Sequence, residues 1–253
     1  MRPALAAAIA LIVAMLAAVA PARALDLENL TDLERNRLRT EIRDYLLEHP
    51  EVIMEAVAVL EQRQAEQQAA EASEVVRANA DALFEDDQSW VGGNPEGDVT
   101  LVEFMDYRCG FCRRAMDDVN KLVEDDGNIR FVLKEFPILG ADSTRAARFA
   151  IATLQVAGDD AYKLIHDTLM SYEGSYEDAA LARLAGMLGI DAQPILDHMD
   201  SDEVSEVIAD NHRLAQRLQI RGTPTFVVED QLLRGFVPLE EMQRIVSGIR
   251  DDA

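Results

Sequence analysis

The sequence is short of cysteine and of positive charge. Its 253 residues include only two cysteines, three positions apart, so neither a disulfide framework nor a four-thiolate zinc site is possible. Lys and Arg number 24 against 47 Asp and Glu, and the resulting net charge of −23 opposes binding to nucleic-acid phosphates or anionic lipid. No glycine-rich phosphate loop is present, and the histidines have no i, i+4 pairing. We therefore expect no nucleic-acid partner, and we expect His49, His166, His198 and His212 at the surface or at its boundary.

The one long hydrophobic run lies at the N-terminus. Arg2 precedes an apolar run over residues 4–19, and a small-x-small triplet ends at Ala24. This order is typical of a secretory signal peptide, with an uncleaved membrane anchor as the alternative. We expect residues 1–24 to be a signal peptide cleaved after Ala24, and the mature protein to be periplasmic, where disulfides form.

Two short amphipathic helices are predicted over residues 25–60. Thr31 and Glu34 have the spacing of a capping box, and Pro50 is typical of the first residue of a second helix. Two such helices have too little apolar surface to form a core alone, so we predict that they pack on another chain. Docking on the domain that follows is the alternative. The apolar stripes comprise Leu30, Leu33, Leu38, Ile42 and Leu46, and then Val52, Ile53, Ala56, Val57 and Leu60.

Residues 61–90 are rich in Ala, Glu and Gln and contain few large apolar side chains. Such a segment can be helical but has little to bury, which predicts a helical or flexible spacer. The glycines and the proline between residues 92 and 97 then indicate a loop.

A domain of the α/β class is predicted over residues 91–253. Residues 99–105 (VTLVEFM) and 129–134 (IRFVLK) have the length and β-branched content of buried strands. The residues between them, 110–124, have room for a helix. This order predicts a parallel strand, helix, strand unit.

The remainder of this domain is predicted to contain a helical insert and a terminal hairpin. Helical segments follow one another over about 141–216 and form the insert. Residues 225–228 (TFVV) and 231–236 then form a hairpin-like pair, and residues 240–249 form a last amphipathic helix.

Cys109 and Cys112 form a Cys-x-x-Cys motif at the end of the first predicted strand. This position places Cys109 at a helix N-terminus, where free N–H groups and the helix dipole lower a thiol pKa from about 8.5 to about 3.5–7.5. Cys112, one turn further, can resolve a mixed disulfide. Two alternatives to redox chemistry are a structural disulfide and half of a zinc site. A structural disulfide would close so small a ring that it would remove little chain entropy, and the sequence has no further cysteine to complete a zinc site. The motif therefore predicts redox chemistry without a bound cofactor.

The stretch VEFMDYRCGFC, with RGTPTFVV far downstream, resembles the DsbA-like class of exported thiol-disulfide oxidoreductases. The resemblance covers about residues 99–249. It implies a thioredoxin fold with a helical insertion, and substrates that are exported proteins with thiols or disulfides. It also implies a membrane redox partner that resets the two cysteines.

The resemblance also implies roles for single residues. Pro224 matches a cis-proline that faces the thiols, and Thr223 matches the preceding residue, which contacts the substrate backbone. Glu103 matches a buried acid that assists proton transfer at the second thiol, with a solvated strand carboxylate as the alternative. Phe111, between the cysteines, is expected to contact substrate.

The motif departs from DsbA itself, which has Pro-His where this chain has Gly110 and Phe111. Arg108, Arg113 and Arg114 can replace part of the missing imidazole by their charge, or they can be ordinary surface residues. If the Cys109 thiolate is less stabilised than in DsbA, the Cys109–Cys112 pair is less oxidising. This favours an isomerase or reductase over a DsbA-type dithiol oxidase. A periplasmic copper-tolerance protein that holds Cu(I) between both sulfurs, and an inert scaffold, are the alternatives of other classes.

A second resemblance concerns the predicted N-terminal helices. The stretch LRTEIRDYLLEHPEVIMEAV resembles the helical region of the subgroup related to the suppressor of copper sensitivity protein C. Some members of that subgroup trimerise through this region, and the trimers can act as disulfide isomerases. The resemblance implies a homo-oligomer, with a trimer favoured.

Overall fold

The computed structural model describes residues 30–251, so the predicted signal peptide lies outside the described residues. The chain divides into two compact units, Met1–Arg63 and Gln64–Ala253. Within residues 30–251, none of the helices combines the length and apolar character that a membrane crossing requires. The helices and strands are, in chain order, α2 (Asp32–Glu48), α3 (Glu51–Arg77), α4 (Ala80–Phe84), β1 (Trp90–Gly93), β2 (Val99–Met105), α5 (Gly110–Asp126), β3 (Ile129–Glu135), α6 (Ala141–Ala157), α7 (Asp159–Ser171), α8 (Asp178–Met187), α9 (Ala192–His198), α10 (Asp202–Arg217), β4 (Thr225–Val228), β5 (Gln231–Arg234) and α11 (Leu239–Asp251).

The first unit contains α2 and the start of α3. The predicted capping box is confirmed, because the Thr31 hydroxyl accepts from the Glu34 N–H at 3.3 Å and the Glu34 carboxylate accepts from the Thr31 N–H at 2.9 Å. The second helix begins at Glu51, so Pro50 stands immediately before the helix and not at its first position. No residue of α2 is buried.

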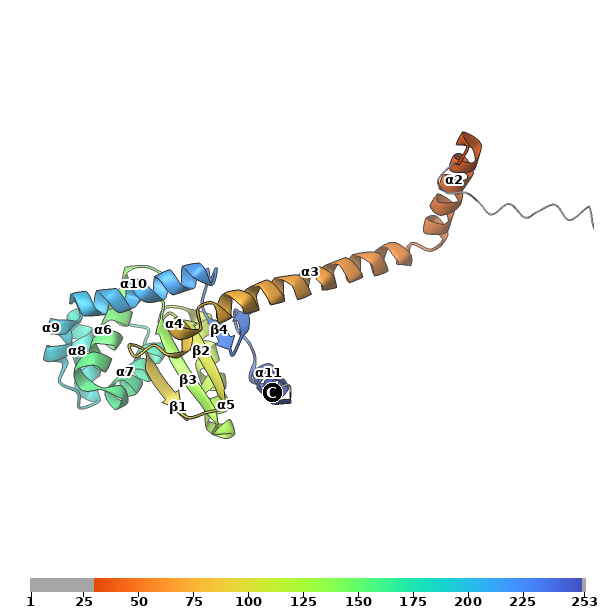
Figure 1. Ribbon diagram of the computed structural model, residues 1–253. Coiled ribbons are helices and arrows are strands. Elements are labelled where there is room, and N and C mark those ends of the chain that lie inside the picture. The colour runs from red at the N-terminus through yellow and green to blue at the C-terminus, as the bar shows by residue number, and fades with distance from the viewer. Residues whose placement is uncertain (1–29, 252–253) are drawn as a thin grey trace, which may run out of the picture. The chain divides into compact units, whose positions relative to one another are not determined.

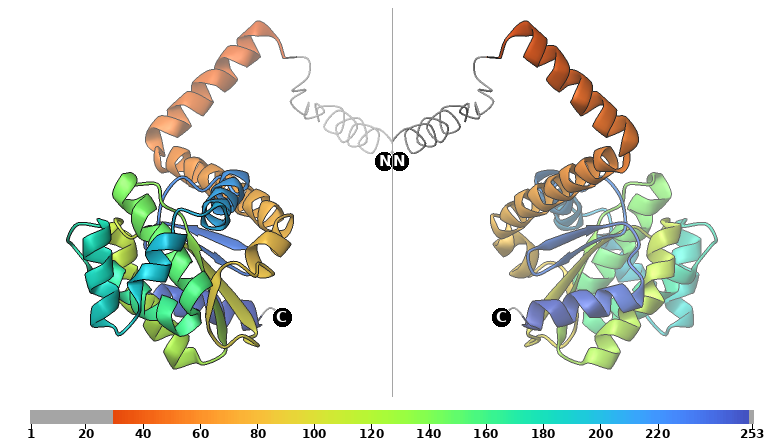
Figure 2. Two further views of the ribbon diagram at one scale, coloured as in Figure 1. Left: turned by 90° about the vertical axis from the view of Figure 1, so that its left-hand side faces the viewer. Right: turned by 90° about the vertical axis from the view of Figure 1, so that its right-hand side faces the viewer.

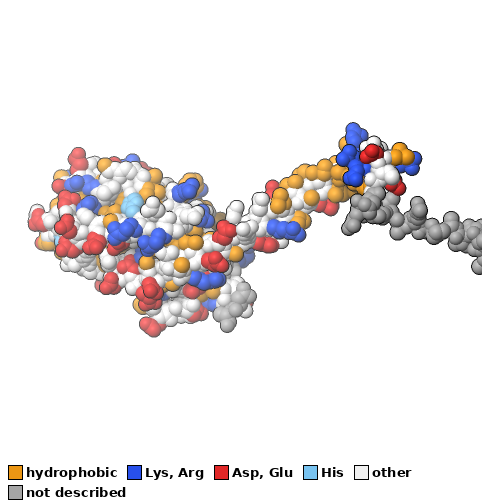
Figure 3. All heavy atoms as spheres, turned by 45° about the horizontal axis from the view of Figure 1, so that its top comes forward, with side chains coloured by type: hydrophobic (Ala, Val, Ile, Leu, Met, Phe, Trp, Pro, Cys, Tyr) orange, Lys and Arg blue, Asp and Glu red, His pale blue; other side chains and the backbone are white. Residues whose placement is uncertain are grey.

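Large apolar side chains of this unit are exposed to solvent. Their exposed fractions lie between 41% and 68%. Figure 3 shows hydrophobic side chains gathered along the N-terminal half of α3. Many exposed large apolar side chains in one segment are typical of an interaction site in soluble proteins. The N-terminal apolar face, as we call it, comprises Leu33, Ile42, Tyr45 and Leu47 of α2 and Ile53, Met54, Val57, Val59 and Leu60 of α3.

The second half of the predicted spacer, residues 61–90, packs against the sheet of the domain that follows. Helix α3 continues without a break to Arg77, and Val76 and Leu83 are buried in a core cluster with residues of β2 and β3. Asp230, before β5, accepts a hydrogen bond from the Arg77 guanidinium at 3.1 Å. Val76 and Leu83 are isolated apolar residues in a polar stretch, so they produce little periodicity in the sequence.

A buried ion pair connects the same segment to the sheet. Lys134 of β3 is 1% exposed, and its ammonium group pairs with the Asp86 carboxylate and donates to the Ala82 carbonyl oxygen at 3.0 Å. Burial lowers the pKa of Lys134, but Asp86 supplies the opposite charge that such a position requires. The residues that surround α4 therefore belong to the second unit.

Five strands form one mixed sheet in the order β1-β3-β2-β4-β5. Strands β2 and β3 are parallel, with Glu103 opposite Leu133, and α5 connects them, which confirms the predicted strand, helix, strand unit. Strands β4 and β5 form an antiparallel hairpin, and β4 pairs with β2. This arrangement, with α11 after the hairpin, is the thioredoxin fold that the resemblance implies. Helices α6 to α10 between β3 and β4 are the predicted insert.

Strand β1 is an edge strand that the sequence analysis missed. It pairs antiparallel with β3, placing Trp90 opposite Leu133. Two of its four residues are glycines, which are rare in strands. Gly93 has a φ of 68°, and a Cβ at this position would collide with the Ile129 carbonyl oxygen. Glycine makes this strand hard to recognise in the sequence, yet Gly93 is required because β1 lies so close to β3 at this position.

The sheet separates two core clusters. Alternate residues of a strand point to opposite faces, so Leu101 and Met105 of β2 lie in one cluster and Val102 and Phe104 in the other. The first face is covered by α5, α11 and the helices of the insert, and the second by α4 and the ends of α3 and α10. Figure 1 shows α6 to α9 beside the sheet, and Figure 2 shows α11 and α10 on its opposite sides. The two cysteines lie on the first face.

Candidate active site

Strand β2 leads the chain to Cys109, the N-cap residue of α5. The Cys109 sulfur accepts a hydrogen bond from the backbone N–H of Cys112 at 3.4 Å, as a capping side chain does. As a thiol it also donates to the Thr223 carbonyl oxygen at 3.1 Å. The structure thus places Cys109 at the helix N-terminus predicted from the motif.

These surroundings lower the pKa of the Cys109 thiol to about 5. The hydrogen bond with the Cys112 side chain is the largest cause. Contacts with Thr223 and with the backbone of Cys112 and Phe111 act in the same direction, while partial burial opposes them. A lowered pKa means that the thiolate is present above about pH 5. This value lies within the range predicted for a cysteine at a helix N-terminus, and α5 and Cys112 stabilise the thiolate although the imidazole of DsbA is absent.

Cys112 has the opposite character. Its side chain is fully buried, at 0% exposure, and burial raises its pKa far above the ordinary value of a thiol. The two sulfurs are unbridged in this structure. The pair therefore combines a thiolate at Cys109, which is 6% exposed, with a fully buried thiol at Cys112 that keeps its proton.

The arginines beside the motif have contact partners other than the Cys109 sulfur. Arg113 donates to the carbonyl oxygens of Tyr107 and Tyr172, at 2.9 and 2.6 Å, and so holds the loop before α5 against the insert. Arg108 pairs with an α6 carboxylate at 3.2 Å, and the Arg114 guanidinium lies 5.2 Å from the centre of the ring between the cysteines. Among the described residues, none of the three forms a hydrogen bond to the Cys109 sulfur.

The loop before β4 forms the other side of the site. The Thr223–Pro224 peptide bond is cis, as the resemblance implies, and it is the Thr223 carbonyl that faces Cys109. A hollow of about 400 Å³ is lined by Thr223, Pro224 and their neighbours. Phe111 is 55% exposed, which is unusual for so large an apolar side chain. The reactive sulfur therefore lies between an exposed ring and an open loop.

Glu103 lies in β2, six residues before Cys109, and is buried with 3% exposure. One of its carboxylate oxygens has no hydrogen-bond partner among the described residues. Burial raises the pKa of Glu103 to about 8, and the negative charges of Cys109 and Glu135 add to this effect. The alternative of a solvated strand carboxylate is wrong. The carboxyl group is near enough to influence both cysteines electrostatically.

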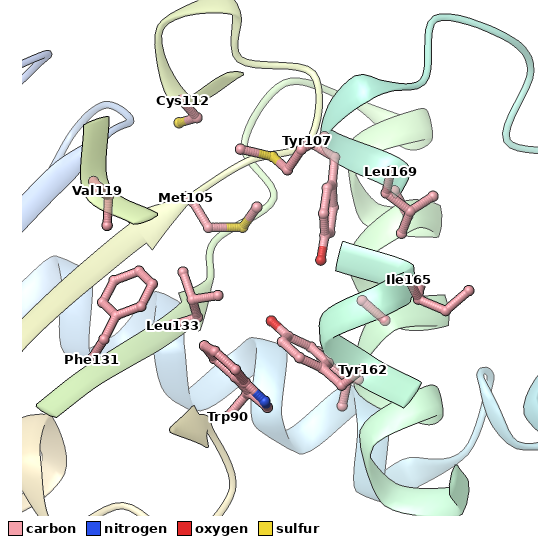
Figure 4. Packing of buried hydrophobic residues seen from close by; sticks show 14 of the residues in the cluster. Trp90, Met105, Tyr107, Cys112, Val119, Phe131, Leu133, Tyr162, Ile165 and Leu169 are labelled. Carbon is pink, nitrogen blue, oxygen red and sulfur yellow. The ribbon is translucent and has the colours of Figure 1, made fainter. Parts of the chain in front are cut away.

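A buried polar cluster on the same face was missed by the sequence analysis. Glu135 accepts hydrogen bonds from the hydroxyls of Tyr107 and Tyr162, both at 2.7 Å, and the His166 ring lies 3.2 Å from the Tyr107 hydroxyl. Figure 4 shows the two tyrosine hydroxyls pointing into the same space. Burial raises the pKa of Glu135 to about 8 and lowers that of His166 to about 3. His166 is thus a neutral buried residue and not the expected surface residue, because α7 turns it toward the sheet.

Metal ligands are sparse around these groups. Within residues 30–251, no cluster of three or more His, Cys, Asp or Glu side chains is arranged to hold a metal ion. The two sulfurs are the soft ligands that a Cu(I) ion would find at this site.

Two family profiles match different parts of the chain. A family profile described as DSBA-like thioredoxin domain matches residues 100–247. A second, described as Copper resistance protein ScsC N-terminal domain, matches residues 34–67.

Solved structures support the same assignment. A thioredoxin-like oxidoreductase from Silicibacter pomeroyi DSS-3 is 44% identical, with a TM-score of 0.64, covering 68% of this chain and 98% of that one. A linker-deletion mutant of ScsC from Proteus mirabilis has a TM-score of 0.66 at 23% identity, covering 88% of this chain and 98% of that one. The second likeness shows the fold alone.

A curated relative shares only a part of its own length with this chain. The Na(+)/H(+) antiporter NhaA 1 of Salinispora arenicola is 30% identical over 162 residues, which are 64% of this chain and 24% of the antiporter. The chain thus spans about a quarter of that relative's length.

The match that covers most of the sheet, both cysteines and the insert is the first family profile. Because it extends over more than half of the sequence, the chain belongs to the family of DsbA-like thioredoxin domains.

Proposed function

We propose that this protein is an exported thiol-disulfide oxidoreductase that acts on protein disulfides, mainly as an isomerase. The observation that carries the proposal is the asymmetric cysteine pair. Cys109 has a pKa lowered to about 5, while Cys112 is buried and stays protonated. A stabilised thiolate beside a buried thiol is the arrangement that attacks disulfides and then releases the product.

In the proposed reaction the Cys109 thiolate attacks one sulfur of a substrate disulfide. A new disulfide forms between Cys109 and that sulfur, and the other substrate sulfur leaves as a thiolate. In isomerisation, the freed substrate thiolate exchanges with other disulfides of the same substrate, and a substrate thiolate then attacks the substrate sulfur of the mixed disulfide. This last step forms a new substrate disulfide and releases Cys109 as the thiolate. In net reduction, Cys112 displaces the substrate thiol, the pair becomes oxidised, and the proton of Cys112 passes to Glu103. With a pKa of about 8, Glu103 can both take up and return a proton near neutral pH.

The loop and the exposed ring provide the proposed substrate contacts. Thr223 and Pro224 border the hollow next to the reactive sulfur, and an extended peptide can lie along such a loop. Phe111 offers apolar area on the other side of Cys109. We assign these three residues to substrate binding, Cys109 to attack, Cys112 to resolution and Glu103 to proton transfer.

The isomerase direction is supported by the first unit. Its N-terminal apolar face is exposed, and residues 34–67 match the ScsC N-terminal domain. Self-association through this face, with a trimer favoured, would hold several Cys109 sites around one misfolded substrate and raise their local concentration. A dithiol oxidase of the DsbA type is the alternative, and the lowered pKa of Cys109 is compatible with it. In either direction we propose a periplasmic location and a membrane partner that resets the cysteines.

The pH dependence of disulfide attack tests the proposal. The rate at which the reduced protein attacks a model disulfide should be half-maximal near pH 5, the pKa of Cys109, and flat at higher pH, because the thiolate is already fully formed there. Stopped-flow measurement from about pH 4 to 9 covers this range and the ordinary thiol pKa of about 8.5. Cys109→Ala should abolish the reaction. A rate that continues to rise tenfold per pH unit through pH 8 would contradict the assignment, since it would report an unperturbed thiol.

A Cu(I) carrier is the second candidate function. Two thiolates are soft ligands that suit Cu(I), and the profile that matches residues 34–67 has copper resistance in its description. A carrier without enzyme activity would bind Cu(I) with Cys109 and Cys112 yet fail to reshuffle the disulfides of a scrambled protein.

A further inference from the structure

Arginines without a carboxylate partner surround the loop that contains Thr223 and Pro224. Arg221 and Arg234 are exposed, and neither side chain forms an ion pair or hydrogen bond within the described part of the chain. Arg114 contacts the rings of Phe111 and Phe236, with its guanidinium 5.2 and 5.6 Å from their centres. Acidic residues outnumber basic ones by 47 to 24, so unpaired arginines gathered at one loop are notable.

The hollow beside the reactive sulfur has two of these arginines in its wall. It measures about 400 Å³ and is lined by Arg221, Thr223, Pro224 and Arg234 together with small and polar neighbours. Arg234 lies opposite Thr225 in the β4–β5 hairpin. The Thr223 carbonyl oxygen is 3.1 Å from the Cys109 sulfur, so the hollow is within reach of the residues that flank a cysteine bound to Cys109.

We propose that this hollow binds the residues flanking the attacked cysteine of a substrate, and that Arg221 and Arg234 select an acidic side chain there. The inference rests on the proposed function and adds the substrate class. The net charge of −23 repels acidic segments in general, but Arg221 and Arg234 supply unpaired positive charge in the wall of the hollow, where an acidic side chain can pair with it. A guanidinium binds a carboxylate through paired, charge-assisted hydrogen bonds.

The two arginines differ in their surroundings. Arg234 also lines an adjoining hollow that contains Glu71 of α3, although the two form no ion pair in the described structure. That carboxylate reduces the positive field at Arg234. Arg221 is therefore expected to contribute the larger part of the preference.

Model peptides test the inference. Each peptide has one cysteine, is used as its disulfide-linked homodimer, and has Glu, Gln or Lys two residues from the cysteine. The Cys109 thiolate forms a disulfide with one peptide, and the other leaves as a thiolate. Cys112 then releases the first peptide, so the dithiol is oxidised and one peptide disulfide is reduced.

The expected result is a preference for the Glu peptide that depends on the arginines. At low salt, Arg221→Gln with Arg234→Gln should lower the second-order rate constant for single-turnover reduction of the Glu peptide by about 3- to 10-fold, the range of two exposed ion pairs. The Gln peptide should change by less than about twofold, as it makes no ion pair. Each peptide is compared between proteins, so its own disulfide reactivity cancels. The preference should shrink in about 0.5 M salt, where exposed charges are screened.

Matched variants exclude a general effect of charge or folding. Arg183→Gln removes an exposed, unpaired arginine from α8 and should leave all three rates unchanged. Arg221→Lys should keep most of the preference, because it keeps the charge. If the double variant reacts with the Glu peptide as fast as the unaltered protein does, the inference is wrong and the proposed function stands. If the unaltered protein reduces none of the peptides, the proposed function itself fails and the inference with it.

Discussion

Replacing Cys112 with alanine is expected to trap the protein in mixed disulfides with its substrates through Cys109. The backbone N–H groups of α5 that stabilise the Cys109 thiolate remain, so attack continues, although the loss of the Cys112 side chain raises the pKa of Cys109. Release then has no neighbouring thiol. Well-placed intramolecular groups reach effective molarities of about 10⁵ M, so the mixed disulfide should persist orders of magnitude longer. Non-reducing electrophoresis of a periplasmic extract would display the trapped species.

The reciprocal variant controls for the assignment of roles. Cys109→Ala leaves only a buried thiol with a strongly raised pKa, and we expect it to capture nothing. Capture that survives Cys109→Ala but is lost with Cys112→Ala would reverse the roles of nucleophile and resolving thiol.

Deleting residues 25–63 is expected to convert an oligomer into a monomer and to slow the reshuffling of scrambled disulfides by about tenfold or more. The N-terminal apolar face is removed, while the site and its fold are kept. The deletion must stop at the unit boundary, because Val76 and Leu83 are buried in the core of the second unit and a later start would expose that core. Light scattering measures the assembly, and reactivation of a scrambled protein measures the reshuffling.

A full-length variant distinguishes the effect of losing the N-terminal apolar face from the effect of shortening the chain. Val57→Ser with Leu60→Ser removes two exposed apolar side chains without shortening α3 and should give the same monomer. If the unaltered mature protein is a monomer, the assembly claim fails. If it is an oligomer and the deletion variant reshuffles equally fast, assembly is real but has no part in isomerisation.

The sequence was sufficient to predict the elements that position the reactive sulfur. Strands β2 and β3 are short, mainly apolar runs that contain β-branched residues, and a Cys-x-x-Cys soon after such a strand places its first cysteine at a helix N-terminus. The cis bond before Pro224 was implied only by the resemblance. Local pattern and family likeness together thus predicted the geometry around Cys109.

The features that escaped prediction depend on contacts between distant segments. Strand β1 exists because Trp90 pairs with Leu133, and its glycines suggest a turn when they are considered alone. His166 and Glu135 share a buried cluster formed by a strand and the helical insert, which no spacing in the sequence indicates. The pKa of Cys109 also depends on hydrogen bonds within the folded site, so the absence of an imidazole between the cysteines does not by itself determine it.

The equilibrium of the Cys109–Cys112 pair with glutathione tests most directly the central claim, that a stabilised Cys109 thiolate exchanges disulfides with protein substrates. A stabilised thiolate favours the reduced pair and makes the couple oxidising. We predict a reduction potential between about −120 and −200 mV, the range of DsbA and protein disulfide isomerase. A potential near that of thioredoxin, about −270 mV, would contradict the account, because the reduced pair would then lack the stabilisation that the structure assigns to Cys109.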